Sequence, residues 1–203
     1  MRPWLVLIAL PLTAAPQPEN SGLAKLTLLV YDLTAMRSSD LAEGLNQTTR
    51  VFRAAGVDLS WTAGSPAAPE AHLLDLSVPT GPHTTPPRHI VARIINKRTP
   101  AFPPGALGWS LPAAQAGAHI TIFWDEIKRL QAEVGSSVPC LLSYALAHEL
   151  GHVLLGSIAH APSGLMRAEW GRPELDRIQH GTLKFSVAEA AMLRARLASL
   201  GRE

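Results

Sequence analysis

The feature that most constrains the fold is a long apolar segment with a start signal and a stop signal. Ser136 and Ser137 precede residues 138–155, and Gly156 follows them. Serine favours the N-cap of a helix, and glycine favours the position just past its end, where a positive φ is needed. The pattern predicts one long apolar helix over 138–155.

This helix carries the sequence His148-Glu149-x-x-His152. Residues four apart share one face of a helix, with Cβ atoms roughly 5–6 Å apart, so both imidazoles can reach one zinc ion at about 2.0–2.1 Å. Glu149 lies one residue further round the helix, where its carboxylate can hold the water at an open zinc position and take its proton. The alternative interpretation is a helix with two polar histidines and a surface glutamate.

The third zinc ligand has three candidates. A catalytic zinc usually takes three protein ligands and keeps one position open. Gly156 ends the helix and lets the chain turn back towards the metal, and His160 arrives four residues later. Glu169 and Glu174 compete with it, because other sites with this helix motif use a downstream glutamate. A local turn that delivers His160 is the simpler path.

The same stretch resembles the metzincin clan of zinc metallopeptidases. The shared features are the His-Glu-x-x-His helix, the glycine that ends it, a third histidine and a methionine turn, to which Ser163-Gly164-Leu165-Met166 is similar. Relative to the clan's usual spacing, this chain has one additional residue before Gly156 and one after it. The resemblance implies the following site: Zn²⁺ on His148, His152 and His160, Glu149 as general base, and Met166 as a floor beneath the metal.

The resemblance also implies an activity. A metzincin-like chain would be a zinc metalloendopeptidase that hydrolyses a peptide or protein substrate. Two other interpretations stay open: the same chemistry with Glu169 as third ligand, as in gluzincins, and a non-catalytic module that binds zinc structurally. A structural site would need a fourth protein ligand, for which Cys140 is the candidate.

The remaining patterns predict an α/β fold in a single domain over residues 16–203. Apolar or alternating runs predict strands, and cap signals predict two further helices. Strands are expected at 24–32, 57–61, 88–95, 106–111 and 118–124, with a short one at 73–78 inside a long loop. Helices are expected from a cap at Ser38-Ser39-Asp40 to about 55, and from the capping box Ser186–Glu189 to about 200. This order favours a sandwich around a mixed sheet, as in the metzincin catalytic domain.

The run 106–111 is the candidate substrate-binding strand. Gly108 punctuates it and Pro112 stops it, which favours an edge strand. In the metzincin clan, an edge strand over the cleft pairs with an extended peptide through main-chain hydrogen bonds. The resemblance therefore implies that Gly108 lets the backbones approach and that Trp109 lines the cleft. The alternative is an ordinary edge strand with Trp109 in the core.

The N-terminus predicts export. Residues 1–3 are a short basic start, residues 4–12 are apolar but too short to span a bilayer, and residues 13–15 are small enough for signal cleavage. We therefore expect a signal peptide over 1–15, a secreted or periplasmic protein, and no membrane span after cleavage. The alternative is an N-terminal anchor.

Composition bears on the partners. The net charge is only +2 and the basic residues are scattered, so no nucleic-acid partner is expected. A chain of 203 residues that is 47% hydrophobic suits one domain with a sizeable core, and we expect a monomer. Cys140 is the single cysteine, so no internal disulfide can form, and we expect a small buried side chain there.

Overall fold

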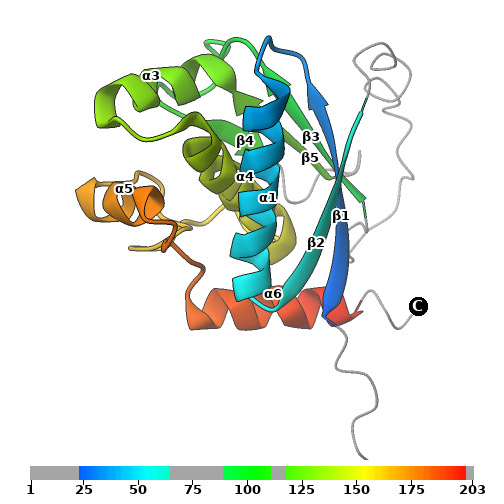
Figure 1. The fold of residues 1–203 in the computed structure, drawn as a ribbon. Coiled ribbons are helices and arrows are strands. Elements are labelled where there is room, and N and C mark those ends of the chain that lie inside the picture. The colour runs from blue at the N-terminus through cyan, green and yellow to red at the C-terminus, as the bar shows by residue number, and fades with distance from the viewer. Residues whose placement is uncertain (1–22, 65–88, 111–117, 200–203) are drawn as a thin grey trace, which may run out of the picture.

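Figure 1 shows the computed structural model, in which helices cover one face of a five-stranded sheet. The structure describes residues 23–64, 89–110 and 118–199, and the expected signal peptide and the expected strand at 73–78 lie outside them. The elements run in the following order: β1 (Ala24–Asp32), α1 (Ser38–Ala54), β2 (Val57–Ala63), β3 (His89–Ile95), β4 (Gly108–Ser110), β5 (Ala118–Phe123), α3 (Trp124–Val134), α4 (Val138–Leu155), α5 (Arg172–Gln179) and α6 (Val187–Ser199).

The sheet is mixed, as the sequence predicts. Its strand order is β2-β1-β3-β5-β4, and every neighbouring pair is parallel except β4 and β5, which are antiparallel. β4 therefore forms one edge, which confirms the expected edge strand, although its ladder covers only three residues. Figure 1 shows this edge next to α4.

Alternate residues of the inner strands form the sheet side of the core. Val30 of β1 pairs with Ala92 of β3, which pairs with Ile120 of β5, and all three side chains are fully buried. Because side chains alternate between the two faces of a strand, the same register places Leu28 and Ile90 on this face. α1 and α4 pack over it, and α6 crosses near one end of the molecule (Figure 1).

α4 is the central helix, and its cap signals act as predicted. The Ser137 hydroxyl accepts a hydrogen bond from the Cys140 amide, and Gly156 takes a φ of 62° at the C-cap. Among the described residues, α4 alone has the length and hydropathy of a membrane span, and 89% of it is buried. The burial explains this composition, because a helix enclosed on all sides by the protein carries few charges.

Of the caps predicted for the other two helices, the structure contains one and lacks the other. The Ser186–Glu189 capping box is confirmed, because each residue's side chain accepts a hydrogen bond from the other's backbone amide. The expected serine cap of α1 is wrong. That helix begins at Ser38 without a side-chain cap, and Arg37 forms an ion pair with Asp40 instead.

Two helices were not predicted. Trp124, expected as the last residue of a strand, begins α3, which has acidic residues in its first turn and ends at Gly135 with a φ of 69°. α5 lies in a segment for which no helix or strand was predicted, with Pro173 in its first turn. The helix start and stop signals were present in both segments, but both helices are short and largely polar.

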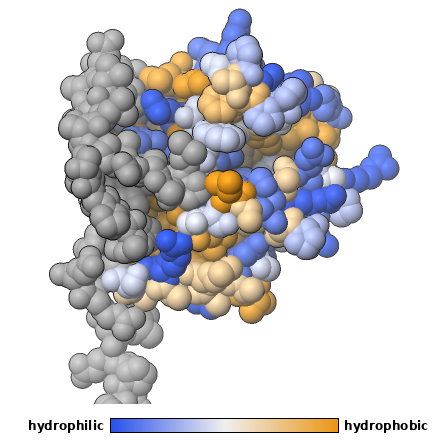
Figure 2. All heavy atoms as spheres, turned by 180° about the vertical axis from the view of Figure 1, so that it is seen from behind, coloured by the Kyte–Doolittle hydropathy of each residue, from blue (hydrophilic) through white to orange (hydrophobic). Residues whose placement is uncertain are grey.

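On the described part of the face in Figure 2, hydrophobic residues lie in small groups among hydrophilic ones. Cys140 is buried in the core, as expected, and its thiol donates a hydrogen bond to the Ile178 carbonyl oxygen at 2.9 Å.

Candidate metal centre and catalytic cleft

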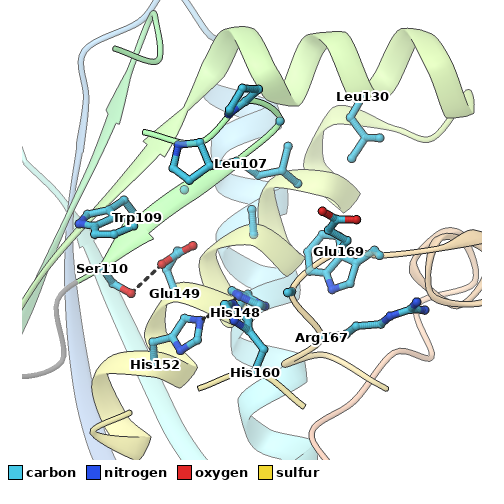
Figure 3. Close-up of a pocket in the computed structure, with 18 of the residues that line it drawn as sticks. Leu107, Trp109, Ser110, Leu130, His148, Glu149, His152, His160, Arg167 and Glu169 are labelled. Atoms are coloured by element: carbon cyan, nitrogen blue, oxygen red, sulfur yellow. Dashed lines mark hydrogen bonds between the residues drawn. The ribbon is translucent and has the colours of Figure 1, made fainter. Parts of the chain in front are cut away.

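Three histidines converge at the C-terminal end of α4. His148 and His152 come from the helix, and His160 comes from the loop that follows Gly156 (Figure 3). The Nε2 atom of His152 lies 3.0 Å from that of His148 and 3.2 Å from that of His160. One potential ligand atom from each of the three histidines lies within 4.8 Å of the others. The structure thus brings together the three predicted ligands.

The hydrogen bonds of the two helical histidines fix which ring nitrogen carries the proton. Nδ1 of His148 lies 2.9 Å from the Leu165 carbonyl oxygen, and Nδ1 of His152 lies 2.8 Å from the Ser157 carbonyl oxygen. A carbonyl oxygen only accepts, so in the neutral rings Nδ1 donates and Nε2 keeps its lone pair. Lone pairs that face one another at such distances repel unless a cation lies between them.

A tetrahedral metal fits this arrangement. Two nitrogens bound at about 2.0–2.1 Å to tetrahedral zinc lie about 3.3 Å apart, close to the spacings of the Nε2 atoms. Burial lowers the pKa of His148 to about 4. The hydrogen bond to the Leu165 carbonyl oxygen opposes this shift, whereas repulsion from His152 and His160 adds to it. Burial also lowers the pKa of His152. Both rings are therefore neutral near pH 7, which is the form that binds metal.

Glu149 lies beside the histidines, between α4 and the edge strand. Its Oε2 accepts a hydrogen bond of 2.6 Å from the Ser110 hydroxyl of β4. Burial raises the pKa of Glu149 to about 7, although the bond from Ser110 opposes the rise. A carboxyl group poised near neutral pH is suited to exchange protons with a reacting molecule.

Gly108 has a visible structural role in this arrangement. A Cβ atom at this position would lie 2.8 Å from Cγ of Glu149 and 2.9 Å from Cδ1 of Ile122. The missing side chain therefore makes room for Glu149, and the approach of a substrate backbone to Gly108 stays a prediction. Ser110, two residues further on the same face, was not singled out from the sequence, although strand periodicity places it beside Gly108.

The predicted methionine turn packs against α4 beside the histidines. Met166 is buried, and a Cβ atom added to Gly151 of α4 would lie 2.5 Å from its Sδ atom. Gly164 takes a φ of 83° inside the turn, and the Ala161 amide donates to the Met166 carbonyl oxygen at 2.8 Å. The turn also supplies the Leu165 carbonyl oxygen, which accepts hydrogen bonds from both His148 and Trp170.

An open cleft of about 640 Å³ lies over the metal centre. Trp109 lines it, is 41% exposed, and packs against Phe102 with ring centroids 5.3 Å apart. The alternative that Trp109 is a core residue is therefore wrong. The Trp170 ring packs at an interplanar angle of 83° to the His148 ring, a contact that the sequence analysis missed because no local pattern indicates it.

The rival ligands take other places in the structure. Glu169 lines the cleft and is exposed, but it does not belong to the group of converging ligand atoms. Glu174 is buried and accepts hydrogen bonds from Arg167 and the Gly171 amide. Cys140 donates its hydrogen bond to Ile178 and is likewise outside the histidine group.

Solved structures with the same fold are known. Archaemetzincin from Methanopyrus kandleri matches with a TM-score of 0.52 and 16% sequence identity, over 86% of this chain and 97% of that one. Metalloproteinase-II from Bacteroides fragilis matches with a TM-score of 0.50 and 11% identity, over 90% of this chain and 55% of that one. No protein-family model and no curated protein matches the sequence. At these identities the similarity defines the fold, which is that of archaemetzincin-like metallopeptidases.

Proposed function

We propose that the protein is a zinc-dependent metallopeptidase that cleaves peptide bonds inside peptide or protein chains. The observation that carries this proposal is the meeting of three imidazole Nε2 atoms beside the buried carboxyl group of Glu149, at the base of an open cleft. The fold shared with archaemetzincin and metalloproteinase-II supports it. A protein ligand set of three with space beside it is typical of catalytic zinc.

The residues of the site divide the chemistry among them. His148, His152 and His160 would hold Zn²⁺, which when bound polarises a carbonyl group and lowers the pKa of water. Glu149 accepts the proton of the water that attacks the peptide carbonyl carbon, and donates it to the amine nitrogen as the C–N bond breaks. The Ser110 hydroxyl holds Oε2 of Glu149, so that Oε1 is the oxygen left to exchange the proton.

The edge strand β4 is proposed as the main-chain docking site for the substrate. Among the described residues it pairs with β5 on one side only, so the main-chain groups on its other side could pair with an extended peptide. Gly108 and Trp109 would contact that peptide, and Trp109 lies on the cleft wall. We also propose that the protein is exported, on the basis of the signal-like residues 1–15.

Replacing Glu149 by glutamine tests the mechanism. The amide keeps the size of the side chain and its acceptor for Ser110 but cannot take up a proton. We expect Glu149→Gln to reduce kcat for peptide hydrolysis by at least about a hundredfold, since a positioned acid–base group contributes roughly 10²–10⁴. Cleavage of casein or mixed peptides by the zinc-loaded protein would be followed by mass spectrometry.

The zinc content of the variant is the matched control. Glu149→Gln should hold as much zinc as the unmodified protein, measured by elemental mass spectrometry, because Glu149 is not a ligand. Undiminished hydrolysis by the zinc-loaded variant would refute the general-base role. Failure of the unmodified, zinc-loaded protein to cleave any peptide would refute the peptidase itself.

A further inference from the structure

Apolar residues line one part of the cleft, on the side of the histidines where Leu107 and Leu130 lie in Figure 3, and this part is termed the recess. Its walls come from the segment before β4, from α3, from α4 and from the segment around α5. They are formed by Leu107, Leu130, Ala145, Trp170 and Leu175. Ala145 is buried and the other four are partly buried, so the recess offers an apolar surface that is open to the cleft.

The charges around this recess are unequally compensated. Arg129 lines the cleft, but it is bound to Glu126 at 2.8 Å and to Glu133. Arg167 also lines it and is bound to Glu174 at 2.7 Å. Glu169 is exposed and forms no hydrogen bond or ion pair with any residue that the structure describes. Figure 3 shows its carboxylate turned towards the side where Leu130 lies.

We infer that this recess selects a lysine or arginine side chain of the substrate next to the scissile bond. This inference rests on the proposed peptidase function. The apolar walls suit the methylene stem of a basic side chain, and the unpaired carboxylate of Glu169 suits its cationic head. An acidic substrate side chain in the same place would be repelled by the Glu169 carboxylate.

The distance between the recess and Glu149 limits which substrate residue can enter it. Ala145 precedes Glu149 by one helical turn, which separates their Cβ atoms by roughly 5–6 Å. An extended peptide advances about 3.3 Å per residue. The side chain in the recess therefore belongs to a residue within one or two positions of the bond that is cut, and Glu169 acts as a specificity-determining residue.

The test is a cleavage profile of the full, zinc-loaded chain on a mixed library of random decapeptides, read by mass spectrometry. We expect lysine and arginine to be enriched about fivefold at one position beside the scissile bond, the upper end for an exposed ion pair. Glu169→Gln should abolish the enrichment, Glu169→Asp should retain part of it, and Glu169→Lys should shift it towards aspartate and glutamate.

Glu43→Gln is the matched control, because Glu43 is an exposed glutamate on α1 and does not line the cleft. It removes the same charge and should leave the profile unchanged. Cleavage without a basic preference, or a basic preference that survives Glu169→Gln, overturns the inference and leaves the peptidase intact. If no peptide is cleaved, the proposed function fails and this inference falls with it.

Discussion

At the scale of single residues, the absence of a side chain at Gly151 decides how closely the methionine turn approaches α4. The added Cβ would lie 2.5 Å from Sδ of Met166 and 3.0 Å from the Phe185 ring. Neither neighbour can move freely, because both are buried in the core. The helix therefore keeps a residue of low helix propensity where the turn packs against it.

We expect Gly151→Ala to lower the free energy of unfolding. Alanine gains roughly 1 kcal/mol in helix propensity, but overpacking in a core costs about 1–3 kcal/mol, so a net loss of up to about 2 kcal/mol is expected. Urea denaturation measures it. As a control, the same Gly151→Ala change is made in the Met166→Ala variant and compared with that variant. There it should be neutral or stabilising, because the clashing sulfur atom is absent. Equal effects in both backgrounds would contradict the packing explanation.

At the scale of elements, the start of α5 depends on one buried carboxylate. Oε2 of Glu174 accepts hydrogen bonds from the Arg167 guanidinium at 2.7 Å and from the amide of Gly171, the N-cap residue, at 3.1 Å. Burial would raise the pKa of Glu174, but the bonds from Arg167 and Gly171 lower it below its ordinary value. The carboxylate thus links α5 to the segment after the methionine turn.

This link predicts a pH-dependent contribution to stability. Because the pKa of Glu174 is lower in the folded protein, its contribution is complete above the unfolded value of about 4.3 and is lost as the pH falls through the folded value. Glu174→Gln should cost about 1–2 kcal/mol at pH 7, and this difference should shrink below about pH 4. Thermal unfolding of both proteins between pH 3 and 7 measures the difference.

Asp176→Asn is the control on the same helix. Asp176 is exposed and its carboxylate lies 3.7 Å from Nδ1 of His180, a solvent-exposed contact, so its replacement should change stability little. A Glu174→Gln effect that stays constant from pH 3 to 7 would show that the charge of Glu174 contributes nothing.

At the scale of the whole molecule, a bound metal would join the core helix α4 to the loop that follows it. His148 and His152 belong to buried α4, whereas His160 is exposed in the loop that follows. Zinc on all three would therefore restrain the segment from Gly156 to the methionine turn. A ligand that binds only the folded state also stabilises the whole chain, by about 4 kcal/mol at a thousand times its Kd.

Zinc should accordingly slow amide hydrogen exchange most strongly between residues 157 and 168, and raise the unfolding temperature. Exchange followed by mass spectrometry, with and without zinc, measures the first effect. His160→Ala should lose most of this protection, while Glu169→Ala should keep it, because Glu169 lies outside the histidine group. The opposite pattern would make Glu169 the third ligand.

Sequence patterns located the parts of this protein that depend on neighbours in the chain. The spacing of His148 and His152, the caps of α4 at Ser137 and Gly156, and the alternation in the strands are local, because the periods of helix and strand fix them. The α/β fold class followed from their order. The helices α3 and α5 were missed although their start and stop signals were present, because Trp124 was assigned to the preceding strand and no element was assigned to the segment after the methionine turn.

Tertiary structure alone decided the relations between distant segments. The hydrogen bond from Ser110 to Glu149 joins residues 39 apart in sequence, and His148 depends on the Leu165 carbonyl oxygen 17 residues later. Tertiary structure also decided that Arg167 pairs with Glu174 and that Glu169 has no ion pair among the described residues. The sequence by itself determined the helix and the two candidate metal ligands on it, whereas the position of His160 and the walls of the cleft required chain folding. The physical reason is that short-range periodicity is encoded residue by residue, while contacts between elements depend on how the entire core packs.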